Sequence, residues 1–79
     1  SIKANIGHAE AAAGIAGLIK MVLCLRHKTI PPQANFSEIN PNIRLESDQI
    51  EIAKASKPWL GHDKKRLGGV SSFGFSGVN

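Results

Sequence analysis

The stretch Ser1-Ile-Lys-Ala-Asn-Ile-Gly-His-Ala-Glu-Ala-Ala-Ala-Gly-Ile-Ala-Gly17 sets the architecture expected of this chain. It combines polar groups at its start with small side chains that lead into an apolar run. From about residue 8 to residue 26 the composition favours a helix whose apolar residues spread over more than one face. Gly14 and Gly17 each cost about 1 kcal/mol against alanine inside a helix, which indicates close packing against another backbone. We therefore predict one buried central helix, preceded by a bend at Gly7.

Beyond this helix the sequence predicts short strands and an extended connection. Three consecutive cations at positions 26–28 complement the negative end of the helix, and two prolines at positions 31–32 prevent its continuation. Prolines and asparagines over residues 29–48 are typical of turns and extended chain. Short strands or extended segments are predicted at residues 2–6, 50–52 and 67–75, the last of them buried. The predicted fold class is α/β.

The composition fits a single domain at most. A chain of 79 residues buries only about 60–65% of its unfolded surface, so its stability alone would be marginal, and we expect a piece of a larger protein. The net charge of +4 is modest, and aromatic residues are too few for a nucleic-acid stacking platform. The apolar run is interrupted by Glu10 and Lys20 and is too short for a bilayer. The single cysteine, Cys24, excludes an internal disulfide and fits a reducing compartment, so we expect a cytoplasmic protein.

His8 is the first candidate for chemistry. It follows Gly7 at the predicted helix start, where the positive end of the helix dipole favours a neutral imidazole. A neutral ring can donate a hydrogen bond to an oxygen that becomes negative. Lys3 would lie near His8 if the residues between them form a compact turn, and Glu10 is either a dipole complement or a counter-ion for Lys3. An ordinary structural role for His8 and Lys3 stays open at this point.

The glycine-rich end Ser71-Ser-Phe-Gly-Phe-Ser-Gly-Val-Asn79 is the second candidate. Its backbone N–H groups can form half of an oxyanion hole, or the segment is simply a β-bulge. It matches neither a phosphate loop nor the Gly-x-Ser-x-Gly elbow of serine hydrolases. Cys24 lies about 24 Å along the predicted helix from His8, too far for proton transfer, so we treat it as a small core residue. His27 and His62 lack partners at metal-ligand spacing, so we predict no metal site.

Taken together, these motifs resemble those of a known family. The run Lys3-Ala-Asn-Ile-Gly-His8-Ala-Glu-Ala-Ala-Ala-Gly14 is similar to the lysine and histidine motif of β-ketoacyl synthases, and residues 71–79 look like their C-terminal glycine-rich loop. Between them, Leu25-Arg-His-Lys-Thr-Ile-Pro-Pro32, Asn40-Pro41 and Lys57-Pro-Trp59 fall in the order and spacing of the ketosynthase domains of modular polyketide synthases. The resemblance covers essentially the whole chain.

The resemblance implies a thiolase-like α/β fold, with residues 1–79 as a part of its C-terminal half. It also implies a decarboxylative Claisen condensation, in which a carbanion formed from a malonyl-type extender attacks an acyl chain held as a cysteine thioester. The implied partners are an acyl carrier protein with its phosphopantetheine, the acyl and malonyl-type thioesters, and a second copy in a homodimer. We expect no directly bound cofactor, and the composition discussed above argues against a nucleic-acid or membrane partner.

The resemblance assigns roles to single residues as well. His8 matches the second active-site histidine, which helps to stabilise the enolate, and Lys3 matches the lysine that supports this histidine. Glu10 matches the acidic residue that usually follows the histidine motif. The gating phenylalanine and its neighbours, whose N–H groups form the oxyanion hole, correspond to Gly74, Phe75 and Gly77.

Two departures from the family pattern have consequences. The usual ending is Gly-Phe-Gly-Gly-Thr-Asn, whereas Ser76 stands where the family often has glycine, so we expect a different loop mobility. The nucleophilic cysteine and the first active-site histidine lie upstream in the family and are absent here, so the isolated chain is expected to be inactive. Three alternatives stay open: a fatty acid synthase ketosynthase, a non-catalytic subunit of the chain-length-factor type, and a small basic binding module that uses Lys64-Lys65-Arg66.

Overall fold

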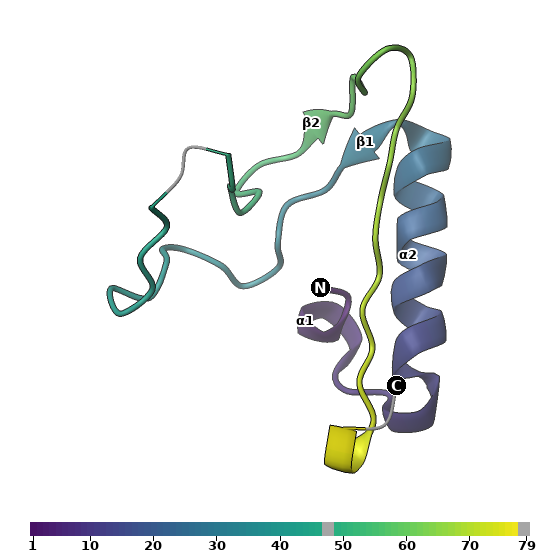
Figure 1. Ribbon diagram of the computed structural model, residues 1–79, viewed down its shortest axis with the longest axis vertical. Coiled ribbons are helices and arrows are strands. Elements are labelled where there is room, and N and C mark those ends of the chain that lie inside the picture. Colours follow the sequence, from purple (N-terminus) through teal and green to yellow (C-terminus); the bar gives the residue numbers. More distant parts are fainter. Residues whose placement is uncertain (47–48, 78–79) are drawn as a thin grey trace.

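One long helix forms the axis of the structure, and extended chain runs on two sides of it (Figure 1). The computed structural model describes residues 1–46 and 49–77; positions 47–48 of the predicted connection and 78–79 of the glycine-rich end lie outside this range. In chain order the elements are α1 (Lys3–Ile6), η1 (Glu10–Ala12), α2 (Ala13–His27), β1 (Thr29–Ile30), β2 (Lys57–Pro58) and η2 (Phe75–Gly77), where η marks a 3-10 helix. The predicted α/β class is confirmed.

The helix α2 begins at Ala13, five residues later than the predicted start at His8. Two residues before it have a left-handed backbone: Gly7 with a φ of 79° and Glu10 with a φ of 48°. A right-handed helix has a φ near −63°, so it cannot run through either position. The prediction of one continuous helix from His8 is therefore wrong, and the short η1 leads into α2 instead.

The end of α2 agrees with the sequence prediction. Basic residues occupy the last turn, and Lys28 closes the helix with a φ of 52°. The Lys28 N–H bonds to the carbonyl groups of Cys24 and Leu25, which would otherwise lack partners at the helix end. In the described part of the chain, no helix has the length and apolar character needed to cross a membrane.

Residues 3–6 form the helix α1 in place of the predicted strand or extended segment. The N–H of Asn5 donates to the carbonyl of Ile2 at 2.9 Å, and the N–H of Gly7 donates to the carbonyl of Lys3 at 2.8 Å. A strand needs hydrogen bonds from a neighbouring strand. In the described chain, no strand lies beside these residues to form such bonds. Their N–H groups instead bond to carbonyl groups three and four residues earlier in the chain, which form a helical turn. The predicted bend at Gly7 is confirmed.

The sheet consists of two short antiparallel strands. Thr29 pairs with Pro58, and Ile30 pairs with Lys57. Beyond the strands, the N–H of Gln33 donates to the carbonyl of Ala53 at 2.8 Å. The strand predicted at residues 50–52 is wrong, because the chain pairs further along. The ladder stays short because the two prolines after β1 have no N–H to donate.

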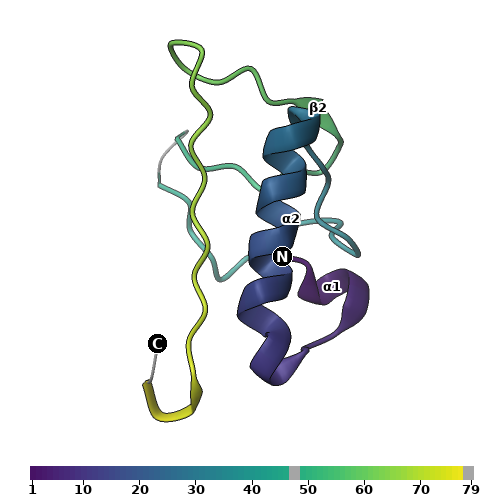
Figure 2. The same cartoon turned by 90° about the vertical axis from the view of Figure 1, so that its right-hand side faces the viewer.

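The C-terminal extended segment, residues 67–74, lies along α2 and contacts its small-residue face (Figure 2). A Cβ atom added to Gly14 would lie 3.1 Å from Oγ of Ser72, and one added to Gly17 would lie 3.3 Å from Cγ1 of Val70. Close packing at these glycines is confirmed, but the predicted neighbour is wrong, because side-chain atoms of the segment approach the helix rather than another backbone. The strand predicted at 67–75 is wrong, because no described residue pairs with this segment in a ladder.

The helix α2 is not buried, contrary to the prediction. No residue of the described chain is buried, and five large apolar side chains on α2 have exposed fractions of 46 to 54%. These side chains are Ile15, Leu18, Ile19, Val22 and Leu23. The accessible surface of 6926 Å² exceeds the value of about 4,600 Å² expected for a compact monomer of this mass. The surface is large because the C-terminal segment covers the glycine face of α2, while the described chain leaves the large apolar side chains of the helix exposed.

Replacing Gly14 with valine should detach the C-terminal segment from α2. The added side chain has no space beside Ser72, and we expect overpacking of about 1–3 kcal/mol in the free energy of unfolding, measured by urea denaturation of the full-length protein that carries these residues. The matched control is Gly69→Val. Its Cβ would meet no atom within 4 Å, and we expect a change within about 0.5 kcal/mol. Equal effects of the two substitutions would contradict the packing argument.

Candidate functional site

His8 lies in the link between α1 and η1, and its ring is bonded to the backbone. The N–H of Glu10 donates to Nδ1 of His8 at 2.9 Å. A ring nitrogen that accepts a hydrogen bond carries no proton, so the neutral ring assigned by this contact holds its proton on Nε2. His8 is exposed, and this N–H can therefore donate outward. The helix dipole invoked in the sequence prediction begins only at Ala13, the first residue of α2, and the role of His8 as a hydrogen-bond donor stays a prediction.

Lys3 and Glu10 flank His8 in the chain but do not pair with each other. Among residues 1–46 and 49–77, neither side chain makes an ion pair or a hydrogen bond. The structure therefore does not form the counter-ion pair considered for Glu10. Its position as the acidic residue in the first turn of η1 agrees with the other interpretation, a charge complement at a helix start.

Lys3 is one of the residues that line a cavity along α2. This cavity has a volume of about 300 Å³ and lies between α1, α2 and the C-terminal segment. Lys20, Cys24 and Ser71 are among its other lining residues, and His8 is not one of them. Lys20 and Cys24 are both half-buried, so Cys24 is a partly covered helix residue and not a core residue. Support of His8 by Lys3 stays a prediction.

The glycine-rich loop forms a tight turn at η2. Ser76 has a φ of 63° and a ψ of 25°, and Gly77 has a φ of 80°. A residue with a side chain pays roughly 1–2 kcal/mol in this left-handed region, whereas glycine enters it freely. The glycine-rich end thus forms a turn and not the β-bulge considered from the sequence, because no described residue pairs with it in a ladder. Phe75 is 99% exposed, and its gating role stays a prediction.

The His8 link and the glycine-rich loop lie at the same end of α2 (Figure 1 and Figure 2). The contact between Gly14 and Ser72 joins the first turn of α2 to the segment that enters the loop. In Figure 2 the purple link and the yellow turn lie on either side of the helix. No hydrogen bond connects them within the described residues. Their convergence on one reacting group stays a prediction.

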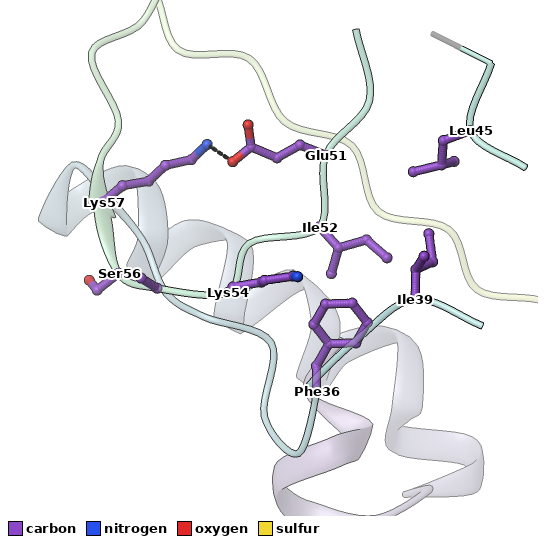
Figure 3. Close-up of a pocket in the computed structure, with 9 residues that line it drawn as sticks. Phe36, Ile39, Leu45, Glu51, Ile52, Lys54, Ser56 and Lys57 are labelled. Carbon is purple, nitrogen blue, oxygen red and sulfur yellow. Dashed lines mark hydrogen bonds and ion pairs between the residues drawn. The ribbon is translucent and has the colours of Figure 1, made fainter. Parts of the chain in front are cut away.

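A groove in the long connection was not predicted from the sequence. It has a volume of about 520 Å³, and Figure 3 shows four large apolar side chains and several polar ones around it. The apolar ones are Phe36, Ile39, Leu45 and Ile52. Nζ of Lys54 lies 5.9 Å from the centre of the Phe36 ring, and Lys57 forms an ion pair with Glu51. The sequence did contain a sign of this groove: residues 29–48 were predicted only as turns and extended chain, yet they include the large apolar residues Phe36, Ile39 and Leu45.

Comparison with known proteins points to one family. Residues 1–37 match the family model of the β-ketoacyl synthase C-terminal domain. The whole chain is 52% identical to part of a non-reducing polyketide synthase of Metarhizium anisopliae and 47% identical to part of erythronolide synthase EryA2 of Saccharopolyspora erythraea. It is 46% identical to part of a phenolphthiocerol/phthiocerol polyketide synthase of Mycobacterium tuberculosis. The chain spans 4%, 2% and 4% of the length of these relatives, respectively. No solved structure matches it.

Replacing Ser76 with glycine should stabilise the loop. Glycine removes the strain of the left-handed backbone at this position, and we expect a gain of about 0.5–1 kcal/mol after the greater backbone entropy of glycine is subtracted. Ser71→Gly is the matched control, since Ser71 has no positive φ, and it should lose about 0.5–1 kcal/mol. Urea unfolding of the full-length protein measures both. A loss of stability on Ser76→Gly would show that the serine is not strained.

Proposed function

Since the chain belongs to the β-ketoacyl synthase family, as the C-terminal part of a ketosynthase domain most like those of type I polyketide synthases, we propose that it works within a larger enzyme that elongates a carrier-bound acyl chain. In this proposal residues 1–79 are part of the C-terminal half of a thiolase-like fold. The uncovered apolar face of α2 supports it, because such a face needs other residues to cover it.

The hydrogen bond from Glu10 to His8 carries this proposal. It fixes the tautomer, so that Nε2–H of His8 is the free donor of the ring. A donor that is already oriented stabilises a negative oxygen without reorganisation when the charge develops. The chain segment between α1 and η1, which contains His8, lies at the same end of α2 as the backbone turn of the glycine-rich loop. Both features suit a reaction that passes through an enolate and an oxyanion.

The proposed reaction is a decarboxylative Claisen condensation. The bond between the malonyl carboxylate and the α-carbon breaks, carbon dioxide leaves, and the electron pair passes into the thioester as an enolate. His8 donates a hydrogen bond to the enolate oxygen, and Lys3 adds positive charge nearby. The α-carbon then attacks the carbonyl carbon of the acyl thioester, and the bond from that carbon to the cysteine sulfur breaks, leaving a thiolate.

The glycine-rich loop has the complementary role in this proposal. Backbone N–H groups around Phe75, beside Gly74 and Gly77, would hold the oxygen of the acyl carbonyl as it becomes negative. The nucleophilic cysteine and a further histidine would come from residues outside this chain, because Cys24 lies near the opposite end of α2 from His8. The chain alone would therefore be inactive, and the complete enzyme would be an acyltransferase.

The proposed reaction requires a carrier as partner. The acyl and malonyl-type groups would reach the site as thioesters on the phosphopantetheine of an acyl carrier protein. The family resemblance adds a second partner, because it implies that the complete enzyme acts as a homodimer. The three relatives named above are polyketide synthases, which favours polyketide over fatty acid synthesis. A non-catalytic protein of the chain-length-factor type remains the alternative, and a nucleophilic cysteine in the rest of the protein would exclude it.

Replacing His8 with alanine in the full-length protein tests the proposed function. We expect condensation and malonyl decarboxylation to fall by about 100-fold or more, because a single oxyanion donor contributes on this scale, while the thermal midpoint stays near that of the parent. Decarboxylation is followed by release of labelled carbon dioxide. His27→Ala is the matched control, since His27 lies in the last turn of α2, and it should retain activity. Near-normal condensation by the His8 variant would refute the assignment.

Reversing the charges of Lys64 and Lys65, in the turn over residues 62–65, tests the proposed carrier partner. His62 and Lys65 exchange backbone hydrogen bonds of 2.9 and 2.8 Å, so that Asp63 and Lys64 form a projecting turn with exposed side chains. The double substitution of Lys64 and Lys65 by glutamate should raise KM for an acidic carrier protein by on the order of tenfold at low salt, with a smaller effect at high salt. Acylation by a small thioester without carrier is the internal control. An equal loss with both substrates would contradict carrier docking.

A further inference from the structure

The helix α1 is too short to keep its shape alone. It has four residues, Lys3–Ile6, and a first helical turn costs more conformational entropy than its hydrogen bonds return. It nevertheless carries Lys3 and leads through Gly7 directly to His8. The positions of both candidate groups therefore depend on contacts from elsewhere in the chain.

Asn35 supplies such a contact from 31 residues away. Its Nδ2 donates to the carbonyl of Ala4 at 3.1 Å. Carbonyl groups at the end of a helix have no partner inside it, so this bond satisfies one of them and attaches α1 to the turn after β1. Figure 2 shows that turn beside α1. Asn35 has a φ of 56°, and asparagine is one of the few residues that tolerate this backbone.

The turn that holds Asn35 is itself anchored. The N–H of Gln33 donates to the carbonyl of Ala53 at 2.8 Å, which ties the turn to the chain before β2. Inside α1, the N–H of Lys3 donates to Oγ of Ser1 at 3.2 Å. The bond from Asn35 to Ala4 thus links α1 to a turn that is itself held by the chain before β2.

We propose that Asn35 is a positioning residue, whose side-chain amide fixes α1 and through it the places of Lys3 and His8. The inference rests on the proposed function and adds to it a residue that touches no reacting atom. It assigns Asn35 an effect on the decarboxylation and condensation step, where His8 acts. It assigns no effect on transfer of the acyl group to the enzyme.

The experiment compares Asn35→Asp with Asn40→Asp in the full-length protein. Aspartate keeps the shape and the tolerance for a left-handed backbone, but at position 35 it can no longer donate to Ala4. Oδ1 of Asn40 only accepts a hydrogen bond, from the N–H of Asn42 at 2.9 Å, so aspartate preserves that contact while adding the same charge. Asn35→Gly is a second variant, which tolerates the left-handed backbone at this position and removes the whole side chain, including the amide, without adding a charge.

We expect both Asn35 variants to lower kcat for condensation by about tenfold, on the scale of one lost hydrogen bond, and to leave enzyme acylation within about twofold. Amide hydrogen exchange over residues 3–8 should rise in the same variants. Asn40→Asp should change neither readout.

Three results would overturn the inference: normal condensation by the Asn35 variants, an equal fall in acylation and condensation, or a fall in condensation without faster exchange. Failure of the proposed function is distinguishable from failure of the inference. In that case the His8 alanine variant also condenses normally, while exchange over residues 3–8 still reports on the contact from Asn35.

Discussion

The contact between the glycine face of α2 and the C-terminal segment is the constraint on which the arrangement of the site depends. Gly14 and Gly17 let the side chains of Ser72 and Val70 approach the helix so closely that an added Cβ would force them to shift. This contact runs the segment along α2 and brings the glycine-rich loop to the end of the helix where His8 lies. The short sheet acts at the other end of α2. There it pairs β1 with β2 and so joins the two ends of the connection over residues 31–56.

The sequence was informative where a residue type restricts the backbone or the space around it. The cations and prolines predicted the end of α2, and the two glycines predicted its tightly packed face. The start of α2 was missed because the left-handed conformation of Glu10 has no signal in a glutamate. A strand was wrongly predicted at 50–52 because alternating apolar residues can also line a groove, as Ile52 does in the connection. Burial of α2 was wrongly predicted because an apolar face indicates a need for cover, not that the same residues provide it.

The candidate site could likewise be predicted from the sequence only in part. The chemical types at Lys3 and His8, and their match to a family motif, could be read directly along the chain. The contacts that orient them could not. The bond from Glu10 to Nδ1 of His8 depends on a backbone angle, and the bond from Asn35 to Ala4 joins residues that only the folded chain brings together. Ser76 was recognised as a departure from the family ending, but only the structure places it in a glycine-like conformation.

The uncovered apolar face of α2 also has a thermal consequence. Water in contact with apolar side chains has a raised heat capacity, so covering this face removes heat capacity, and the driving force for covering it weakens on cooling. Any surface that covers α2 through this face would therefore hold the helix less tightly in the cold than at moderate temperature.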